Sequence, residues 1–131
     1  ISLAAAIAVI EVMQQDRLVE KAKLSGEILK NMLQNLKARH PSVGDVRSIG
    51  LFAAIEVVKN QQTKEPAAPF GGSSPEMSAL RQYLLDHGVY LYTHWNTILI
   101  IPPLIITQSE LEQGLSVIDQ SLYEMDKVVN H

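Results

Sequence analysis

The sequence contains no cysteine, which excludes a disulfide scaffold, thiol catalysis and any metal site with cysteine ligands. An excess of positive charge is also absent, because 11 Lys and Arg residues stand against 14 Asp and Glu residues. The net charge of −3 excludes a nucleic-acid-binding protein that depends on a general basic field. The lack of cysteine is compatible with a reducing compartment, and we expect a cytoplasmic protein.

The apolar run at residues 1–10 is too short to cross a membrane. It ends at Glu11, whereas a membrane-spanning helix needs about 20 apolar residues. No basic region precedes it, as a signal peptide would require. We expect a helix from Ile1 to about Met13. A helix that is apolar on nearly all sides must be covered on all sides, so we expect its cover to come from a longer protein.

The rest of the chain has the composition of one folded domain, with 47% hydrophobic residues in a length of 131. Apolar periodicity predicts helices at 16–39, 74–88 and 107–125 and strands at 46–49, 51–58, 89–92 and 98–101. A surface loop is expected at 60–74. Local signals support these boundaries: N-caps at Asp16, Ser74 and Thr107 (the last in a capping box with Glu110), a turn at Gly44-Asp45, a break at Gly50 and a left-handed exit at Gly88. The predicted fold is α+β, a two-layer sandwich of a small, mainly antiparallel sheet with helices packed on it.

No motif in the sequence identifies a reaction. Gly71-Gly72 is an isolated pair that we interpret as a flexible point in the loop, because no phosphate-binding glycine pattern surrounds it. The histidines do not stand at metal-ligand spacing, so no metal site is predicted; they are His40, His87, His94 and His131.

Two places differ from this background. Tyr90, Tyr92, His94 and Trp95 place most of the few aromatic rings in one hairpin, either as core packing with a solvated turn or as a substrate-contacting loop. Arg47 stands alone in an apolar strand, either in a structural ion pair or backbone contact or in a functional role.

Three segments resemble class III aminotransferases, the pyridoxal-phosphate (PLP) enzymes of fold type I. Residues 45–56, with Arg47 and Gly50, resemble the family's Asp-Val-Arg-x-x-Gly-Leu-x-x-x-Ile-Glu stretch. Residues 98–107, with Pro102 and Pro103, resemble its closing hairpin and Pro-Pro-Leu-x-(Ile/Val)-Thr segment. The helices upstream of residue 21 are similar to those that lead from the large domain into the small one.

The resemblance implies a helix at 1–15 that continues from a missing large domain, and a C-terminal small domain at 16–131. The Lys that forms the Schiff base belongs to the large domain, so no catalytic residue is assigned here, neither to Lys21, Lys23, Lys30 or Lys59 nor to any other position. The full-length enzyme would use PLP, would be a homodimer, and would move an amino group from an amino donor to a 2-oxo acid such as pyruvate. This fragment alone would bind no PLP and would be inactive.

By the same resemblance the small domain forms one wall of the substrate pocket, with Tyr92, His94 and Trp95 seating the donor. Many members place an Arg, which grips a substrate carboxylate, four residues after the hairpin glycine. Counting from Gly88, that position is Tyr92, and tyrosine carries no permanent positive charge. The run from Thr93 to Asn96 is similar to that of enzymes acting on omega-amino acids or sulfonates, notably taurine–pyruvate aminotransferases.

Two other interpretations remain open at this stage. A stand-alone, non-enzymatic α+β ligand-binding or regulatory domain would explain the aromatic hairpin equally well, but it explains the apolar first helix badly. An oligomerisation domain would draw on that Ala-rich helix. The length of the natural open reading frame upstream of Ile1 separates the transaminase from the stand-alone domain.

Overall fold

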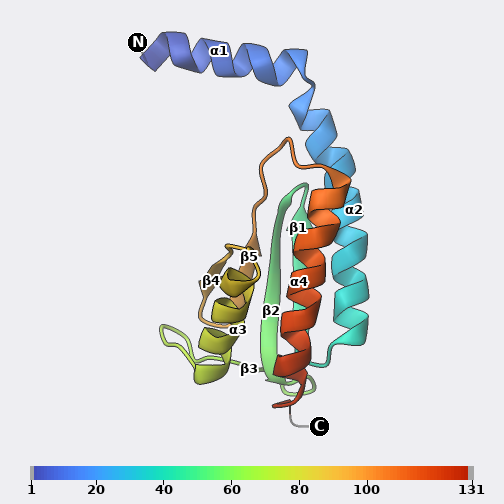
Figure 1. Ribbon diagram of the computed structural model, residues 1–131, viewed down its shortest axis with the longest axis vertical. Helices are drawn as coiled ribbons and strands as arrows, with labels where there is room; N and C mark the ends of the chain where they lie inside the picture. The colour runs from blue at the N-terminus through green and yellow to red at the C-terminus, as the bar shows by residue number, and fades with distance from the viewer. Residues whose placement is uncertain (1, 130–131) are drawn as a thin grey trace.

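The computed structural model describes residues 2–129 and has an α+β fold, as predicted (Figure 1). Its elements in chain order are α1 (Ser2–Gln15), α2 (Leu18–Arg39), β1 (Val43–Ile49), β2 (Phe52–Asn60), β3 (Glu65–Pro66), α3 (Pro75–Asp86), β4 (Tyr92–His94), β5 (Thr97–Ile100) and α4 (Gln108–Asp126). This is the predicted order with one short strand added, β3, inside the loop expected at 60–74.

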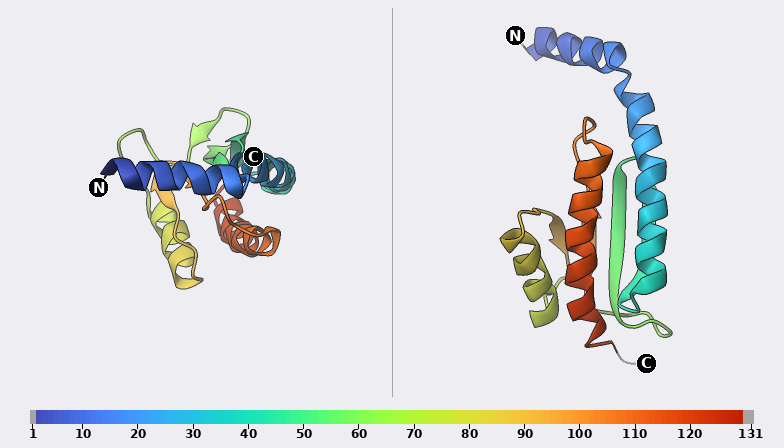
Figure 2. Two further views of the ribbon diagram at one scale, coloured as in Figure 1. Left: turned by 90° about the horizontal axis from the view of Figure 1, so that it is seen from above. Right: turned by 45° about the vertical axis from the view of Figure 1, so that its right-hand side comes forward.

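The sheet is antiparallel throughout. Its main strands lie in the order β1-β2-β5-β4, and β3 pairs with the far end of β2. Figure 2 shows α2, α3 and α4 gathered beside the sheet, while α1 lies crosswise beyond the end of the sheet. Because the three packed helices share one buried cluster with the sheet, they cover one of its faces and leave the other open.

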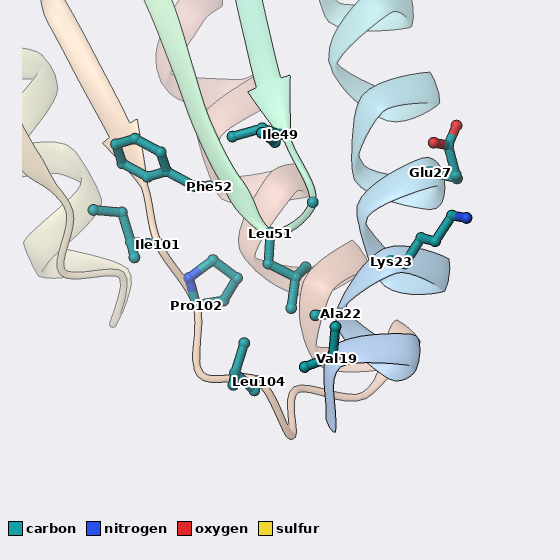
Figure 3. A pocket seen from close by; sticks show the side chains of 11 residues that line it. Val19, Ala22, Lys23, Glu27, Ile49, Leu51, Phe52, Ile101, Pro102 and Leu104 are labelled. Atoms are coloured by element: carbon teal, nitrogen blue, oxygen red, sulfur yellow. The ribbon is translucent and has the colours of Figure 1, made fainter. Parts of the chain in front are cut away.

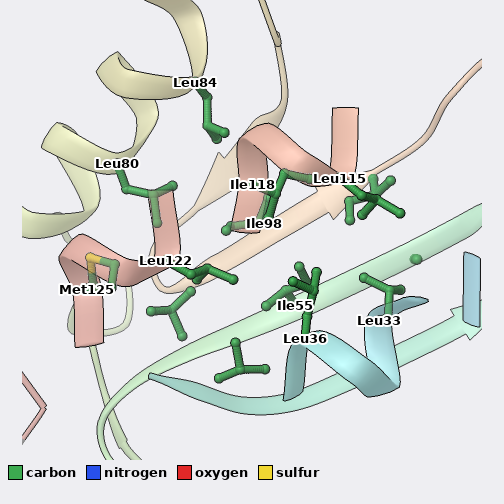
Figure 4. Packing of buried hydrophobic residues seen from close by; sticks show 14 of the residues in the cluster. Leu33, Leu36, Ile55, Leu80, Leu84, Ile98, Leu115, Ile118, Leu122 and Met125 are labelled. Atoms are coloured by element: carbon green, nitrogen blue, oxygen red, sulfur yellow. The ribbon is translucent and has the colours of Figure 1, made fainter. Parts of the chain in front are cut away.

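The core lies between that face and the helices (Figure 4). Alternate residues of the central strands point into it, namely Ala53, Ile55 and Val57 of β2 and Ile98 and Ile100 of β5. The predicted apolar face of α4 is entirely buried; it consists of Leu111, Leu115, Ile118, Leu122 and Met125. Full burial of one such side chain contributes about 1.5–3 kcal/mol, so this face anchors α4 firmly.

The caps predicted for α3 and α4 are confirmed. The Ser74 hydroxyl accepts a hydrogen bond from the Met77 backbone N–H at 3.1 Å, and Pro75 occupies the first turn. Thr107 and Glu110 form the complete capping box. These local bonds satisfy N–H groups at the helix start that have no partner within the helix.

The predicted cap at Asp16 is wrong. The Asp16 N–H still bonds to the Val12 carbonyl at 2.9 Å, so Asp16 ends the preceding turn and caps nothing. Arg17 then adopts a left-handed conformation, with φ of 49°, and α2 begins at Leu18 with no side-chain cap. This single residue redirects the chain, so that α1 points away from the body of the domain (Figure 1).

The predicted turn at Gly44-Asp45 is also wrong, because both residues lie inside β1. The register with β2 shifts between Val43 and Asp45, which marks a bulge at Gly44. A Cβ atom at Gly44 would lie 2.5 Å from a methyl carbon of Val58. Glycine is therefore required here for close approach of the strands rather than for a turn.

The strand predicted at 89–92 begins only at Tyr92. Gly88, with φ of 76°, ends α3 as predicted, and its N–H bonds to the Leu85 carbonyl at 3.0 Å. The Val89 N–H bonds to the Leu84 carbonyl at 2.8 Å, which completes a Schellman motif. This helix-capping bond engages the backbone donor of Val89, and the chain joins the sheet three residues later.

None of the residues of α1 is buried, although several are large and apolar. Leu3, Ile7 and Val9 are each more than half exposed. Across residues 2–129, no helix has both the length and the apolar character needed to cross a membrane.

Candidate functional site

The aromatic hairpin is built by β4, β5 and a two-residue turn at Trp95 and Asn96. His94 pairs directly with Thr97, so strand pairing extends into residues 93–97, which lie between the two strands predicted from the sequence. Trp95 has φ of 53°, a conformation that costs a residue other than glycine about 1–2 kcal/mol. The two-residue turn is the favoured hairpin connection, but its usual residues are Gly and Asn. Packing around Trp95 therefore has to offset this local strain.

Register places Tyr92 and His94 on the open face of the sheet, away from the helices. Direct partners in an antiparallel sheet share a face. Tyr92 pairs with Leu99, and His94 pairs with Thr97. Thr93 pairs with the fully buried Ile98 and so points toward the helices.

The rings of the hairpin form a continuous series. The centroids of Tyr92 and His94 lie 5.7 Å apart, and those of His94 and Trp95 lie 3.9 Å apart in a stacked arrangement. Phe70, from the segment that precedes α3, adds a fourth ring, 4.0 Å from Trp95. The structure thus brings Tyr92, His94 and Trp95 together on a solvent-accessible surface. Tyr90, which the sequence grouped with them, lies before the strand and is 82% exposed.

Arg47 lies on the same open face but at the opposite edge. Cross-strand pairing runs from Arg47 through Ala54 and Leu99 to Tyr92, a span of three strand spacings or about 14 Å. The Arg47 guanidinium lies 3.6 Å from Asp45 and 3.6 Å from Glu56. Of the two roles considered for Arg47, the structure supports the ion pair.

Asp45 connects this ion pair to α2. Lys37 Nζ donates a hydrogen bond to its carboxylate at 2.8 Å. That hydrogen bond is the main cause that lowers the pKa of Asp45, with a smaller contribution from the charge of Arg47. These groups are well exposed to solvent, so each pair contributes little to stability.

Gly50 and Pro102, two further residues of the family motifs, line a groove at the end of the sheet nearest α1. Gly50, with φ of 54°, begins the tight turn between β1 and β2. Pro102 follows β5 and lines a groove of about 450 Å³ together with the β1–β2 turn and the first half of α2 (Figure 3). Its wall is mostly apolar and includes Ile49, Phe52 and Ile101, each more than half exposed. Pro103 lines a second apolar hollow, beneath the start of α4.

The structure reveals one polar cluster that the sequence did not indicate. His40 is 1% exposed, and its Nδ1 lies 2.7 Å from Asp126 while its Nε2 lies 2.8 Å from Asp119. The Ser42 hydroxyl donates to Asp126 at 2.6 Å, and Arg39 pairs with Asp119 at 2.8 Å. No local pattern signals this cluster, because the residues at 39–42 are about 80 residues away from Asp119 and Asp126 in the sequence.

The other histidines take separate positions. His87 is exposed and stacks on Tyr83 with centroids 4.0 Å apart, and His131 lies outside the described residues. Within residues 2–129, no group of three or more potential ligand side chains is arranged to hold a metal ion.

The lysines of the described chain do not fit a PLP attachment site. Three of them are paired with carboxylates: Lys37 with Asp45, Lys59 with Glu76 and Lys127 with Glu124. Lys64 donates to the Gly44 carbonyl at 3.1 Å, and Lys21, Lys23 and Lys30 are exposed on the surface of α2. Within residues 2–129, no lysine makes a hydrogen bond or ion pair to the aromatic hairpin.

An α+β domain with this sheet and an exposed hairpin is found within known enzymes. The family model "Aminotransferase class-III" matches residues 1–122, and the chain belongs to this family. The solved structure of the taurine:2-oxoglutarate aminotransferase from Bifidobacterium kashiwanohense, in complex with PLP and glutamate, superimposes with a TM-score of 0.90 at 33% identity, over 97% of this chain and 28% of that one.

Two curated relatives show the range of activities associated with such sequences. The taurine–pyruvate aminotransferase of Bilophila wadsworthia is 34% identical over 95% of this chain and 28% of its own length. The isoleucine 2-epimerase of Lentilactobacillus buchneri is 37% identical over 90% of this chain and 25% of its own length. The chain therefore spans about a quarter of the length of these relatives.

Proposed function

We propose that this chain is the C-terminal small domain of a longer PLP-dependent aminotransferase, and that its aromatic hairpin forms one wall of the substrate pocket. The observation that carries the pocket role is the shared position of Tyr92 and His94 on the open face of the sheet. Side chains on that face are available to a ligand, whereas the opposite face is filled by the core. Family membership supports the class of reaction.

In the longer enzyme, residues outside this chain would hold the cofactor, which would supply the electron sink for amino transfer. The hairpin would supply ring surfaces, the Tyr92 hydroxyl and the His94 ring nitrogens for contact with the amino donor. Because Arg47 is engaged by two carboxylates, it is poorly placed to grip a substrate carboxylate beside Tyr92. A taurine-like or omega-amino acid donor, with a 2-oxo acid such as pyruvate as acceptor, is the specific form of the proposal.

The proposed domain division is residues 1–15 as a helix of the large domain and 16–131 as the small domain. Two observations support it. The apolar side chains of α1 are exposed, and the groove beside Pro102 is lined by exposed apolar residues at the same end of the molecule. Both surfaces would be covered by a large domain placed at that end. A homodimeric, cytoplasmic enzyme completes the proposal.

The test uses the natural open reading frame that contains this sequence. The purified product is assayed for amino transfer from taurine, β-alanine, 4-aminobutyrate and alanine to pyruvate and 2-oxoglutarate. Chiral chromatography of isoleucine measures the epimerase reaction in parallel. Amino transfer without epimerisation supports the proposal, and epimerisation alone assigns a different reaction. A reading frame with no several-hundred-residue upstream region contradicts the domain assignment and favours a stand-alone domain.

The pocket role is tested with Tyr92→Phe and His94→Ala in the same longer enzyme. Loss of one substrate hydrogen bond corresponds to about a 2- to 12-fold rise in KM for the donor that is used. Ser78→Ala is a suitable control, because its hydroxyl only bonds to the Ser74 carbonyl within α3. Unchanged KM and kcat in both hairpin variants, for every donor, would remove the hairpin from the pocket.

A further inference from the structure

Phe70 sits at the tip of a tight turn that projects from the segment between β3 and α3. The Gly72 N–H bonds to the Pro69 carbonyl at 3.0 Å and closes the turn around Phe70 and Gly71. Gly71 has φ of 74°, the conformation that a type II turn requires at its third residue. Gly71 therefore defines a fixed turn, in contrast to the flexible point that the sequence suggested.

The base of this segment is attached to the core. Ala67 and Ala68 are fully buried, although the region was expected to be a surface loop. The Ala67 N–H bonds to the Val57 carbonyl at 3.0 Å. The short strand β3 precedes them and pairs with the end of β2. The position of Phe70 is thus determined from both sides, by the buried alanines and by the turn.

The hairpin turn is attached to the same residue of β2, Val57. The Val57 N–H bonds to the Asn96 carbonyl at 2.8 Å, and Asn96 Nδ2 donates to the Val57 carbonyl at 3.0 Å. The Val57 carbonyl thus accepts bonds from both Asn96 and Ala67. As a result, the segment that carries Phe70 and the turn that carries Trp95 have a common anchor.

The consequence of this shared anchor is the contact between Phe70 and Trp95. Their ring centroids lie 4.0 Å apart at an interplanar angle of 43°, and Trp95 stacks on His94 on its other side. Phe70 is 86% exposed, so its ring adds little buried area to the core. Its contact with Trp95 instead restrains a residue whose backbone conformation is strained.

We propose that Phe70 is a positioning residue for the substrate pocket: it holds Trp95, and through Trp95 the His94 ring, in the orientation that contacts the amino donor. This role rests on the proposed function, because it presumes that the hairpin contacts substrate. The common anchor at Val57 sets the distance between the two turns. The Phe70 ring spans this distance and contacts Trp95.

The structural half of the test uses the 131-residue chain, in which Trp95 is the only tryptophan. Its fluorescence therefore reports on the hairpin turn alone. Phe70→Ala is expected to increase quenching of this fluorescence by iodide, because one side of the indole ring loses its cover. Phe70→Tyr keeps the ring and should quench like the wild type. Tyr90→Ala removes a comparably exposed ring that lies before β4 and should also leave quenching unchanged.

The functional half uses the longer enzyme with its best donor. Phe70→Ala should raise KM for the donor about 3- to 10-fold, the value of one aromatic contact, with kcat unchanged. Phe70→Tyr should restore the wild-type KM, and Tyr90→Ala should retain it. A general loss of folding would lower the active fraction, and with it the apparent kcat, rather than raise KM selectively.

Three outcomes overturn the proposal, and they are distinguishable. Unchanged quenching in Phe70→Ala refutes the contact itself, whatever the enzyme does. Increased quenching with unchanged KM, while Trp95→Ala raises KM, refutes the positioning role and leaves the substrate pocket intact. Unchanged KM in both Phe70→Ala and Trp95→Ala refutes the positioning role; if KM is also unchanged in Tyr92→Phe and His94→Ala, the pocket role in the proposed function fails as well.

Discussion

His40 Nδ1 lies 2.7 Å from a carboxylate oxygen of Asp126, and this contact joins the C-terminal end of α2 to the C-terminal end of α4. The second ring nitrogen contacts Asp119, which lies about two turns earlier on the same face of α4. The ring also meets Tyr123 edge-on, with centroids 4.7 Å apart. The imidazole therefore fastens α2 to α4 where the chain leaves α2 for the sheet. Buried polar groups of this kind are costly when a partner is removed.

The first prediction concerns this cluster. His40→Ala should lower the free energy of unfolding of the 131-residue chain by about 2–4 kcal/mol, because two carboxylates lose a buried partner. His87→Ala removes an exposed histidine and should cost less than about 1 kcal/mol. Urea denaturation followed by circular dichroism measures both. Equal losses in the two variants would show that the buried cluster contributes nothing particular to stability.

The second prediction concerns the capping box of α4 and pH. The Thr107 N–H, and secondarily its hydroxyl, hydrogen-bond the Glu110 carboxylate at 2.8 and 2.7 Å and lower the pKa of Glu110 from its ordinary value of 4.5. A carboxyl whose pKa is lowered by folding adds stability above its unfolded pKa, and this is lost as pH falls through the folded pKa. The stability difference between wild type and Glu110→Gln should therefore shrink as the pH falls below the ordinary pKa of 4.5 and through the lowered pKa of the folded state.

That comparison needs the variant and not the wild type alone, because the pKa values of Asp45 and Glu76 are lowered as well. Protonation of each of these three carboxyls at acidic pH lowers the stability of the domain. Urea midpoints of both proteins across the pH range isolate the contribution of Glu110. A difference that stays constant with pH would contradict the assignment.

The third prediction uses two helical glycines with opposite surroundings. A Cβ atom at Gly26 in α2 would lie 2.5 Å from the Gly50 Cα atom, so the helix and the β1–β2 turn touch through their backbones. Gly26→Ala should destabilise the domain by about 1–3 kcal/mol or more, because neither backbone can move aside easily. Gly114 in α4 has no atom within 4 Å of the added carbon, and Gly114→Ala should stabilise by about 0.5–1 kcal/mol. Thermal unfolding measures the change in stability of each variant. A change of the same sign in both variants would be inconsistent with the structure.

The fourth prediction is that the 131-residue chain neither transfers amino groups nor binds PLP. Its lysines are exposed or engaged by Asp45, Glu76, Glu124 and the Gly44 carbonyl, and none bonds to the hairpin within the described residues. Mixing the chain with PLP and measuring absorbance after dialysis tests binding, and an assay with several donors and pyruvate tests activity. Stoichiometric retention of PLP or turnover of any donor would refute this prediction.

Local sequence was sufficient for several features that depend on neighbours in the chain. The α4 capping box, the Ser74 cap, the left-handed Gly88 and the apolar face from Leu111 to Met125 all depend on residues within a few positions, and all were predicted. The α+β class followed from the order of these elements. Two wrong predictions have local causes, since Asp16 continues the last turn of α1 and Val89 completes the cap of α3. The wrong turn at Gly44-Asp45 has a distant cause, because pairing with β2 makes it a bulged strand.

In the candidate site, too, some features follow from the sequence and others only from the tertiary structure. By itself, the sequence determined that Tyr92, His94 and Trp95 share a hairpin, because strand alternation and turn position are local properties, and its motifs pointed to the family. The tertiary structure alone decided which face of the sheet these residues occupy, that Phe70 meets Trp95, and that His40 lies between Asp119 and Asp126. Those contacts join segments separated by about 25 to 86 residues, and they form only when the sheet register and the packing of α4 bring the segments together.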